Sequence, residues 1–276
     1  MKNIIVPLDF SDDSLNGLDF AIIIAEKLKA NIYMIFVQRK RSSFQTFSKD
    51  DEYNYAKDKF ENILETYKNK ISTDIKIEYV IKSGKIYKEV VDFTSEVQEP
   101  LIITATHGSS GFEETFVGSN ALKIVSYSNC PVVLVRNGIF PKSINKIVMP
   151  LDMSVATKEK VPATIEIAKA FDSEIFLVDI AAKKGHDIRF RMNLDSHEVS
   201  HYLNKQKIPH QTELLIGPNI ANVIIEHVKK LNADLIVGVS EHDKKVSSLI
   251  GPNALQLIHK TPVPILIIPS DEEMKK

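Results

Sequence analysis

Short apolar runs alternate with amphipathic segments along the first half of the chain. Residues 4–8 form an apolar run of the kind found in a strand that is buried on both faces. Ser11 can cap the helix that follows. Four apolar residues of this helix are expected on one face: Leu15, Leu18, Ile22 and Ala25. The alternation continues, and it predicts further strands at 32–37, 75–81, 101–104 and 132–135, separated by helices at 50–70, 85–97 and 118–128.

A regular alternation of strands and helices predicts a parallel sheet with helices on both faces. Since crossover connections between parallel strands are right-handed, the expected fold is a doubly wound, Rossmann-like α/β domain with a five-stranded parallel sheet. Such a sheet binds ligands beyond the carboxyl ends of its strands, where the strand order reverses. The first candidate position is therefore Asp9, directly after the first strand.

The second half of the chain repeats the first half. Residues 147–154 carry the same Pro-Leu-Asp sequence as residues 4–11, so that Asp152 corresponds to Asp9. Three further pairs correspond: Gly84 and Gly217, Gly118 and Gly251, Pro131 and Pro264. One net shortening of the second copy, in the region that matches residues 36–76, explains the change of spacing between these pairs. The repeat is too long for a solenoid unit, so the sequence predicts two tandem domains at residues 1–138 and 144–271.

Composition and charge narrow the classes of function. The formal net charge is -1, which gives no electrostatic case for a nucleic-acid or membrane partner. Cys130 is the only cysteine, so an intramolecular disulfide and a thiolate zinc cluster are excluded. Its place in front of Pro131 and an apolar run predicts a buried, unreactive thiol. The apolar runs are far too short to span a bilayer, and the first residues show no signal peptide, so we expect a cytoplasmic location.

Glycines gather in one loop of the first copy. The chain has 10 glycines in 276 residues, and Gly108, Gly111 and Gly118 all lie between the fourth expected strand and the helix that follows it. Glycine lets a backbone approach a ligand closely, and the free N–H groups at the start of a helix suit a phosphate. Ser119 adds a hydroxyl donor at this helix start. The alternative is a glycine-rich turn and a helix cap without any ligand.

The spacing of these residues resembles the universal stress protein family. The family pattern G-x2-G-x9-G-[ST] follows the fourth strand, and this chain has Ala105, Gly108, Gly118 and Ser119 at those positions. A Pro-Val-Val-Leu-Val segment at 131–135 and a Val-Pro-Leu-Asp start at 6–9 complete the likeness. The resemblance covers both copies and implies a tandem member of this family.

The resemblance also implies an adenine-nucleotide site in the first copy. In nucleotide-binding members, the aspartate after the first strand and the end of the second strand contact the adenosine. The glycines and the hydroxyl hold the ribose and the phosphates. Carried over to this chain, the expected contacts are Pro7, Asp9, Val37, Ala105, Gly108, Gly118, Ser119 and Asn120. His107 is a further candidate, as a hydrogen-bond donor to phosphate, although a histidine that faces solvent is the simpler interpretation.

Several positions depart from the family pattern. Ala105 replaces the first glycine, and its methyl group would crowd the ribose if the backbone there had a positive φ. At the four pattern positions the second copy has Gly238, Glu241, Gly251 and Pro252. Glu241 places negative charge where a phosphate would lie, and Pro252 lacks both the hydroxyl and the N–H. Asp179, at the position of Phe36, adds further negative charge, so we expect no nucleotide of this kind in the second copy.

One further motif suggests metal chemistry. Residues 197–201 have the sequence His-Glu-Val-Ser-His. Two histidines four apart share a helix face on which zinc could bind, with the glutamate as a base. A third ligand would have to be His186, Asp195, His210 or a residue of a neighbouring chain. A solvated helix face explains His197 and His201 without a metal, and we therefore assign no metal site.

Three functions remain open at this point. The first is a stress-response regulator whose first copy binds ATP or a related adenine nucleotide, with the need for Mg²⁺ undetermined and with at most slow hydrolysis. The second is a nucleotide-independent scaffold or a protein that binds another small ligand. The third is a zinc-dependent enzyme that uses His197 and His201. We also expect the two copies to form an intramolecular pseudo-dimer through their fifth strands, with a homodimer and an unidentified protein partner as open alternatives.

Overall fold

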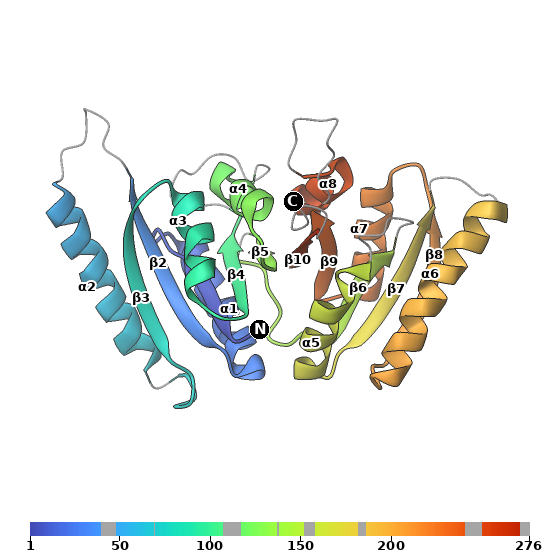
Figure 1. Cartoon of the computed structure of the whole chain (residues 1–276), viewed down its shortest axis with the longest axis horizontal. Coiled ribbons are helices and arrows are strands. Elements are labelled where there is room, and N and C mark those ends of the chain that lie inside the picture. Colours follow the sequence, from blue (N-terminus) through green and yellow to red (C-terminus); the bar gives the residue numbers. More distant parts are fainter. Residues whose placement is uncertain are drawn as a thin grey trace. The chain divides into compact units, whose positions relative to one another are not determined.

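The computed structural model of the chain divides into two compact units, Met1–Gly138 and Ile139–Lys276. The residues that it describes are 1–39, 48–68, 70–106, 117–136, 138–151, 158–181, 186–240 and 250–270. Each unit has a twisted sheet that is flanked by helices (Figure 1). In the described part of the chain, no helix is both long enough and apolar enough to cross a membrane.

The sheet of the first unit is parallel, with its first strand at the centre and further strands added on both sides. Its described strands are β1 (Asn3–Pro7), β2 (Asn31–Arg39), β3 (Ile77–Gly84), β4 (Pro100–Ala105) and β5 (Val132–Val135). β1 pairs with β2 and β4, while β3 pairs with β2 and β5 with β4, all in parallel. The order within this unit is therefore β3-β2-β1-β4-β5, which confirms the expected doubly wound fold.

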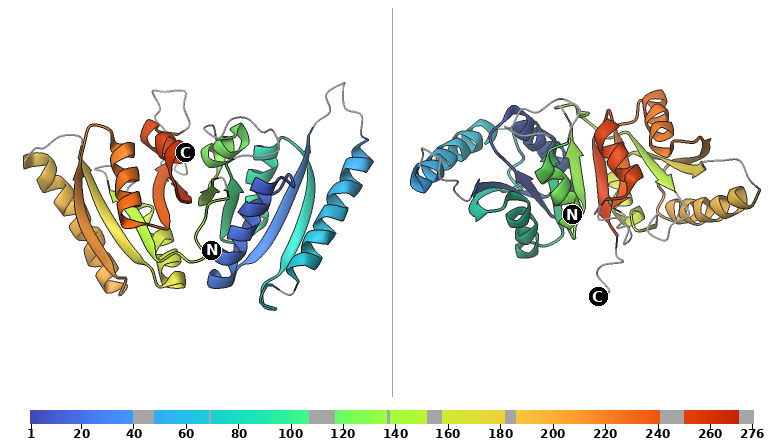
Figure 2. Two further views of the ribbon diagram at one scale, coloured as in Figure 1. Left: turned by 180° about the vertical axis from the view of Figure 1, so that it is seen from behind. Right: turned by 90° about the horizontal axis from the view of Figure 1, so that it is seen from above.

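Helices cover both faces of this sheet (Figures 1 and 2). They are α1 (Asp12–Leu28), α2 (Lys49–Tyr67), α3 (Ile86–Phe93) and α4 (Ser119–Tyr127). α3 is shorter than the helix expected at 85–97, because the chain continues from it as a 3-10 turn, η1 (Thr94–Glu96). The cap expected at Ser11 is confirmed: its side-chain oxygen accepts a hydrogen bond from the Ser14 N–H at 3.3 Å.

The buried face of α1 agrees only in part with the one expected from sequence. Leu18 and Ala25 are buried as expected, whereas Leu15 and Ile22 are only half-buried and Gly17 and Ala21 are buried in addition. Close packing against β4 explains the difference, because a Cβ added at Gly17 would lie 3.4 Å from the Ala105 amide nitrogen. The helix therefore turns small residues toward the sheet, and larger apolar side chains flank the contact.

The second unit repeats the topology of the first. Its described strands are β6 (Lys146–Leu151), β7 (Glu174–Ala181), β8 (His210–Ile216), β9 (Leu235–Ser240) and β10 (Ile265–Pro269). Its described helices are α5 (Val161–Phe171), α6 (His186–Lys205), α7 (Ile220–Leu231) and α8 (Pro252–Lys260). The pairings are again parallel and give the order β8-β7-β6-β9-β10. The sequence repeat thus corresponds to two Rossmann-like folds.

The central strand of the first unit, β1, lies inside its core. Ile4, Ile5 and Val6 of β1 are all fully buried, although neighbouring side chains point to opposite faces of the sheet. Burial on both faces is what a continuous apolar run predicts for a parallel sheet that is covered by helices on each side. The carboxyl end of β1 then delivers Pro7 and Asp9 to the rim of the sheet.

Candidate functional site

A cleft of about 1000 Å³ lies at the carboxyl ends of the strands in the first unit. It is lined by the ends of β1, β2 and β4, by the turn between β3 and α3, and by the first turns of α4. The described residues of the expected nucleotide site all contribute to this lining: Pro7, Asp9, Val37, Ala105, Gly118, Ser119 and Asn120. His107 and Gly108 lie outside the described residues.

The strand order explains why these segments meet. β1 has β2 on one side and β4 on the other, so the connections that leave β1 and β4 run toward opposite edges of the sheet. A crevice forms where such connections diverge, and this is the usual ligand position in doubly wound folds. The topology therefore brings together residues that are far apart in the sequence.

Asp9 is held in place by the first turn of α1. Its Oδ1 accepts hydrogen bonds from the Ser11 N–H at 3.1 Å and from the Ser11 hydroxyl at 2.5 Å. The Ser14 hydroxyl donates in turn to the Ser11 carbonyl oxygen at 2.9 Å. Hydrogen bonds to a charged carboxylate are among the stronger ones in proteins, so they fix the orientation of Asp9. A ligand hydroxyl or amino group would meet an acceptor that is already positioned.

The start of α4 lies beside the end of β4. Gly118 caps this helix with φ −58° and ψ 142°, and its N–H donates to the Thr106 carbonyl oxygen at 2.6 Å. A Cβ at residue 118 would lie 3.1 Å from the same oxygen, so close approach of the backbone, not a positive φ, accounts for the glycine. The first N–H groups of a helix lack intrahelical partners. Together with the Ser119 hydroxyl, they form a set of donors that suits an anion.

Ala105, which stands at the position of the first glycine in the family pattern, fits its surroundings. It is the last residue of β4 and is not one of the described residues that have a positive φ. A Cβ at Gly17 would lie 4.0 Å from the Ala105 Cβ, so the methyl group points toward α1 at a place where the helix has no side chain. The condition for crowding by Ala105 is therefore not met.

An aromatic cluster forms another wall of the cleft. None of its residues was predicted from the sequence. Phe10 has a φ of 64°, which is a strained conformation for a bulky residue. Its ring stacks on Phe36 with centroids 5.2 Å apart and contacts Tyr55 and Phe60 edge-on at 6.0 Å and 5.1 Å. Phe10, Phe36 and Tyr55 line the cleft. The only signal in the sequence was a phenylalanine directly after Asp9, at the junction of strand and helix.

The charged side chains of the cleft come from opposite sides of it. Asp9 follows β1 and Glu52 lies on α2, whereas Lys85 precedes α3 and Lys123 lies on α4. The two lysines could not be assigned to one site from the sequence, because their spacing does not reveal that α3 and α4 pack together. The cleft therefore has an acidic side and a basic side.

In the second unit, α8 starts with nearly the same backbone conformation as α4 but with different side chains. Gly251 caps α8 with φ −59° and ψ 150°, close to the values of Gly118, and Pro252 is the first residue of the helix. Proline is well tolerated there, because the first helical N–H has no partner in the helix, but it offers neither the N–H nor the hydroxyl of Ser119. Asp179 is buried in β7 opposite Leu151 of β6. Glu241 lies outside the described residues.

The His-Glu-Val-Ser-His segment lies on α6, with His197 and His201 both exposed. Glu198 forms an ion pair with Lys158 at 2.5 Å. His210 is engaged on both ring nitrogens: Nε2 with the Ser200 hydroxyl at 2.7 Å and Nδ1 with the Ile208 carbonyl oxygen at 2.9 Å. Within the described ranges, no three His, Cys, Asp or Glu side chains are grouped closely enough to hold a metal ion. His186 and Asp195 lie where side chains are not described, and the solvated helix face stays a prediction.

Cys130 is buried between the end of α4 and the start of β5. Burial raises the pKa of its thiol to about 11, against a smaller lowering by the hydrogen bond with the Ser128 hydroxyl. A thiol with such a pKa is almost entirely protonated at neutral pH, and the thiolate is the nucleophile. The expected buried, unreactive thiol agrees with this environment.

The fold defines the class of the protein as a tandem of two doubly wound α/β units, with a cleft at the carboxyl edge of the first sheet. The family model described as "Universal stress protein family" matches residues 1–136 and again residues 143–269. The chain belongs to the universal stress protein family, as the spacing of its glycines suggested.

Individual relatives agree with this assignment. A universal stress protein of Methanocaldococcus jannaschii is 29% identical over 145 residues, which are 49% of this chain and 82% of the relative. The universal stress protein YxiE of Bacillus subtilis is 28% identical over 148 residues, which are 49% of this chain and 99% of the relative. The crystal structure of a universal stress protein from Archaeoglobus fulgidus matches both units, with a TM-score of 0.76, 20% identity and coverage of 97% of this chain and 98% of that one.

Proposed function

We propose that the cleft of the first unit binds ATP or a related adenine nucleotide, and that the protein is a nucleotide-dependent regulator in the response to stress. One observation carries the proposal: Asp9, Val37 and the segment Gly118–Asn120, from three separate parts of the chain, line a single cleft. Its volume of about 1000 Å³ is at the upper end of the range that small-molecule sites occupy, and it leaves room for a nucleotide with its phosphates.

The chemistry of the lining supports one orientation of the nucleotide. The positioned Asp9 carboxylate accepts hydrogen bonds, so it suits ribose hydroxyls or an amino group, and Val37 with the rings of Phe10 and Phe36 offers apolar surface to a base. The start of α4 offers N–H groups and the Ser119 hydroxyl, which suit phosphate. The adenosine would therefore lie against β1 and β2, with its phosphates directed to α4.

We assign the nucleotide cleft a regulatory role and no efficient hydrolysis of the nucleotide. The sequence has no Walker A motif and no Ser-His-Asp arrangement, so any hydrolysis would be slow. A nucleotide that binds only the folded first unit stabilises that unit by mass action. By ordering the residues around the cleft, it would change the surface that the unit presents to a partner. The proposal places the protein in the cytoplasm, where ATP is available. Pairing of the two copies within the chain and binding of an unidentified protein stay predictions. A homodimer is a further prediction, and analytical ultracentrifugation with and without ATP would test it.

A second candidate function concerns the second unit. At the start of α8, Pro252 lacks the N–H and the hydroxyl that Ser119 offers at the start of α4. The buried carboxyl of Asp179 stands at the position that Phe36 has in the first unit. These replacements favour a scaffold or a site for a different small ligand in this half of the chain. The two functions are compatible, because each uses its own sheet.

The deciding experiment exchanges one residue between the copies. Ser119→Pro gives the first unit the residue that the second unit has as Pro252, so α4 should still form while a hydroxyl and an N–H are lost. Calorimetric titration should give at most one ATP site per wild-type chain and a strongly reduced affinity for this variant. The matched control, Pro252→Ser, should leave stoichiometry and affinity unchanged. Two equivalent sites in the wild type, or none, would contradict the proposal.

A further inference from the structure

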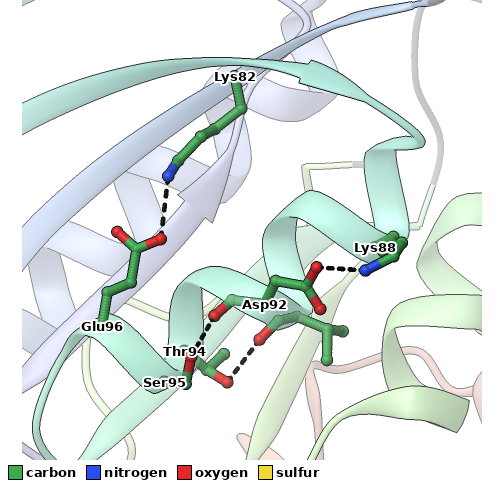
Figure 3. A network of polar contacts seen from close by, with 7 residues as sticks. Lys82, Lys88, Asp92, Thr94, Ser95 and Glu96 are labelled. Atoms are coloured by element: carbon green, nitrogen blue, oxygen red, sulfur yellow. Dashed lines mark hydrogen bonds and ion pairs between the residues drawn. The ribbon is translucent and has the colours of Figure 1, made fainter.

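The lysines around α3 differ in whether they have an acidic partner. Lys82 forms an ion pair with Glu96 at 3.0 Å, and Lys88 forms one with Asp92 at 2.5 Å (Figure 3). Lys85, between these two, instead lines the cleft, and no carboxylate of the described residues lies within ion-pair distance of it. The ion pairs therefore leave one lysine of this segment available to a ligand.

Lys123 approaches the same cleft from the neighbouring helix. It lies on α4, just over one turn after Ser119, and its Nζ is 5.4 Å from the centre of the Tyr87 ring. Tyr87 also lines the cleft, and its ring contacts Tyr127 with centroids 5.3 Å apart. A cation over an aromatic face is attracted to it and is held there without loss of its charge. Tyr87 thus orients Lys123 and does not neutralise it.

The second copy provides an internal comparison. Counted from the corresponding glycines Gly84 and Gly217, Lys85 matches Pro218; counted from Gly118 and Gly251, Lys123 matches Gln256. Both cations are thus absent from the copy in which Pro252 replaces Ser119. General solubility or packing of the fold would not require the two lysines and the hydroxyl to be lost together, whereas loss of an anionic ligand explains all three changes.

We propose that Lys85 and Lys123 form the cationic end of the cleft and select for the terminal phosphates of the bound nucleotide, so that the site prefers ATP to AMP, adenosine and cyclic nucleotides. The inference rests on the proposed nucleotide site and adds to it which nucleotides are recognised. Each phosphate beyond the first adds negative charge at the end that faces α3 and α4. Asp9 and Glu52 lie on the opposite side, where they favour the uncharged adenosine over a phosphate.

The physical size of the effect follows from exposure. Both lysines are exposed, so water and salt screen their attraction for a phosphate, and the loss of one such contact is expected to weaken binding about three- to tenfold at low salt. The same screening predicts that the affinity of the wild type for ATP falls as salt is raised, and that it falls less steeply once the lysines are removed. Adenosine has no phosphate and should show neither dependence.

The test is calorimetric titration of the full chain with ATP, AMP, adenosine and inorganic tripolyphosphate at two salt concentrations. The variants are Lys85→Met, Lys123→Met, the double variant and Lys123→Arg, and the matched control is Lys88→Met, whose lysine lies on α3 and is paired with Asp92. We expect the single Met variants to lose about three- to tenfold in affinity for ATP, with adenosine unchanged. Lys123→Arg should keep wild-type affinity, and Lys88→Met should have no effect.

Each other outcome overturns one identifiable part of the reasoning. If ATP binds but the Met variants bind it as tightly as wild type, or weaken ATP and adenosine equally, the phosphate role of the lysines is wrong and the nucleotide site stands. If neither ATP nor adenosine binds while tripolyphosphate binds and depends on the two lysines, the cationic end is real and the nucleotide proposal fails. If no ligand binds the wild type, both fail.

Discussion

Replacing Phe60 by alanine tests how much the cleft depends on the aromatic cluster behind it. Phe60 is fully buried, stacks on Tyr79 with centroids 4.7 Å apart and contacts Phe10 edge-on at 5.1 Å. Truncation of a buried phenylalanine lowers the free energy of unfolding by about 3–5 kcal/mol. The two aromatic pairs account for roughly 0.5–1.5 kcal/mol each. Phe60→Leu, which keeps most of the volume, should therefore lose about 1–3 kcal/mol.

Hydrogen–deuterium exchange read by mass spectrometry is the appropriate assay, because it reports on each unit separately. Since 1.4 kcal/mol corresponds to a factor of ten, the slowest-exchanging amides of β2 and β3 should exchange at least about a hundredfold faster in Phe60→Ala. Phe60→Leu should lie between this variant and the wild type. The reasoning also predicts weaker ATP binding in both variants, because Phe10 lines the cleft and packs on Phe60.

Leu203→Ala is the matched control, because Leu203 is equally buried but belongs to α6 of the second unit. It should accelerate exchange in β7 and β8 and leave the first unit and its ATP affinity unchanged. An acceleration of less than about tenfold in β2 and β3 of Phe60→Ala would show that the cluster contributes far less than buried area and ring contacts imply. A Phe60→Leu variant that exchanges as slowly as the wild type would refute the part assigned to ring pairing.

Three further outcomes are expected. Ser11→Ala removes a helix cap and the hydroxyl hydrogen bond to Asp9, while the backbone N–H that also donates to Asp9 is kept, so a urea titration should show about 1 kcal/mol less stability and calorimetry weaker ATP binding; Ser48→Ala, a cap outside the cleft, should lower stability alone. Burial lowers the pKa of His227, so the folded state binds fewer protons than the unfolded one, and urea midpoints should fall as pH drops below about 6.5. His227→Leu should flatten this dependence. Because burial raises the pKa of Cys130 to about 11, a disulfide reagent at pH 8 should label it rapidly only after unfolding.

The fold could be predicted from the sequence because its main determinants are local. The run at 4–8 is apolar on every residue and became β1, and Ser11 caps α1 as its side chain and position predict. Because the second half of the chain repeats the first, the same reasoning predicted the fold of the second unit. The face of α1 was predicted only in part, because the position of Gly17 against Ala105 depends on how closely helix and strand approach, which apolar spacing alone does not encode.

The candidate site could be predicted only in part, for a related reason. Asp9 and Ser119 lie next to strand ends and helix starts, so the sequence could place them at the carboxyl edge of the sheet. The ring of Tyr55 reaches Phe10 from α2, and Lys123 reaches Tyr87 from α4. Both contacts depend on the packing of helices that are separated in sequence by whole strands. Spacing within one segment carries no information about such neighbours.

The two copies differ in one part of the family pattern and agree in another. Gly118 and Gly251 cap their helices with nearly the same backbone angles, although the residues after them are Ser119 and Pro252. In the first unit the glycine is required by the approach of its backbone to the Thr106 carbonyl, which is a contact of the fold and involves no ligand. The contact gives a reason for a glycine at this position that does not depend on a ligand. On the proposed function, the hydroxyl of Ser119 and the charge of Lys123 one turn further along the helix, and not the glycine, are what would distinguish a phosphate site from an ordinary helix start.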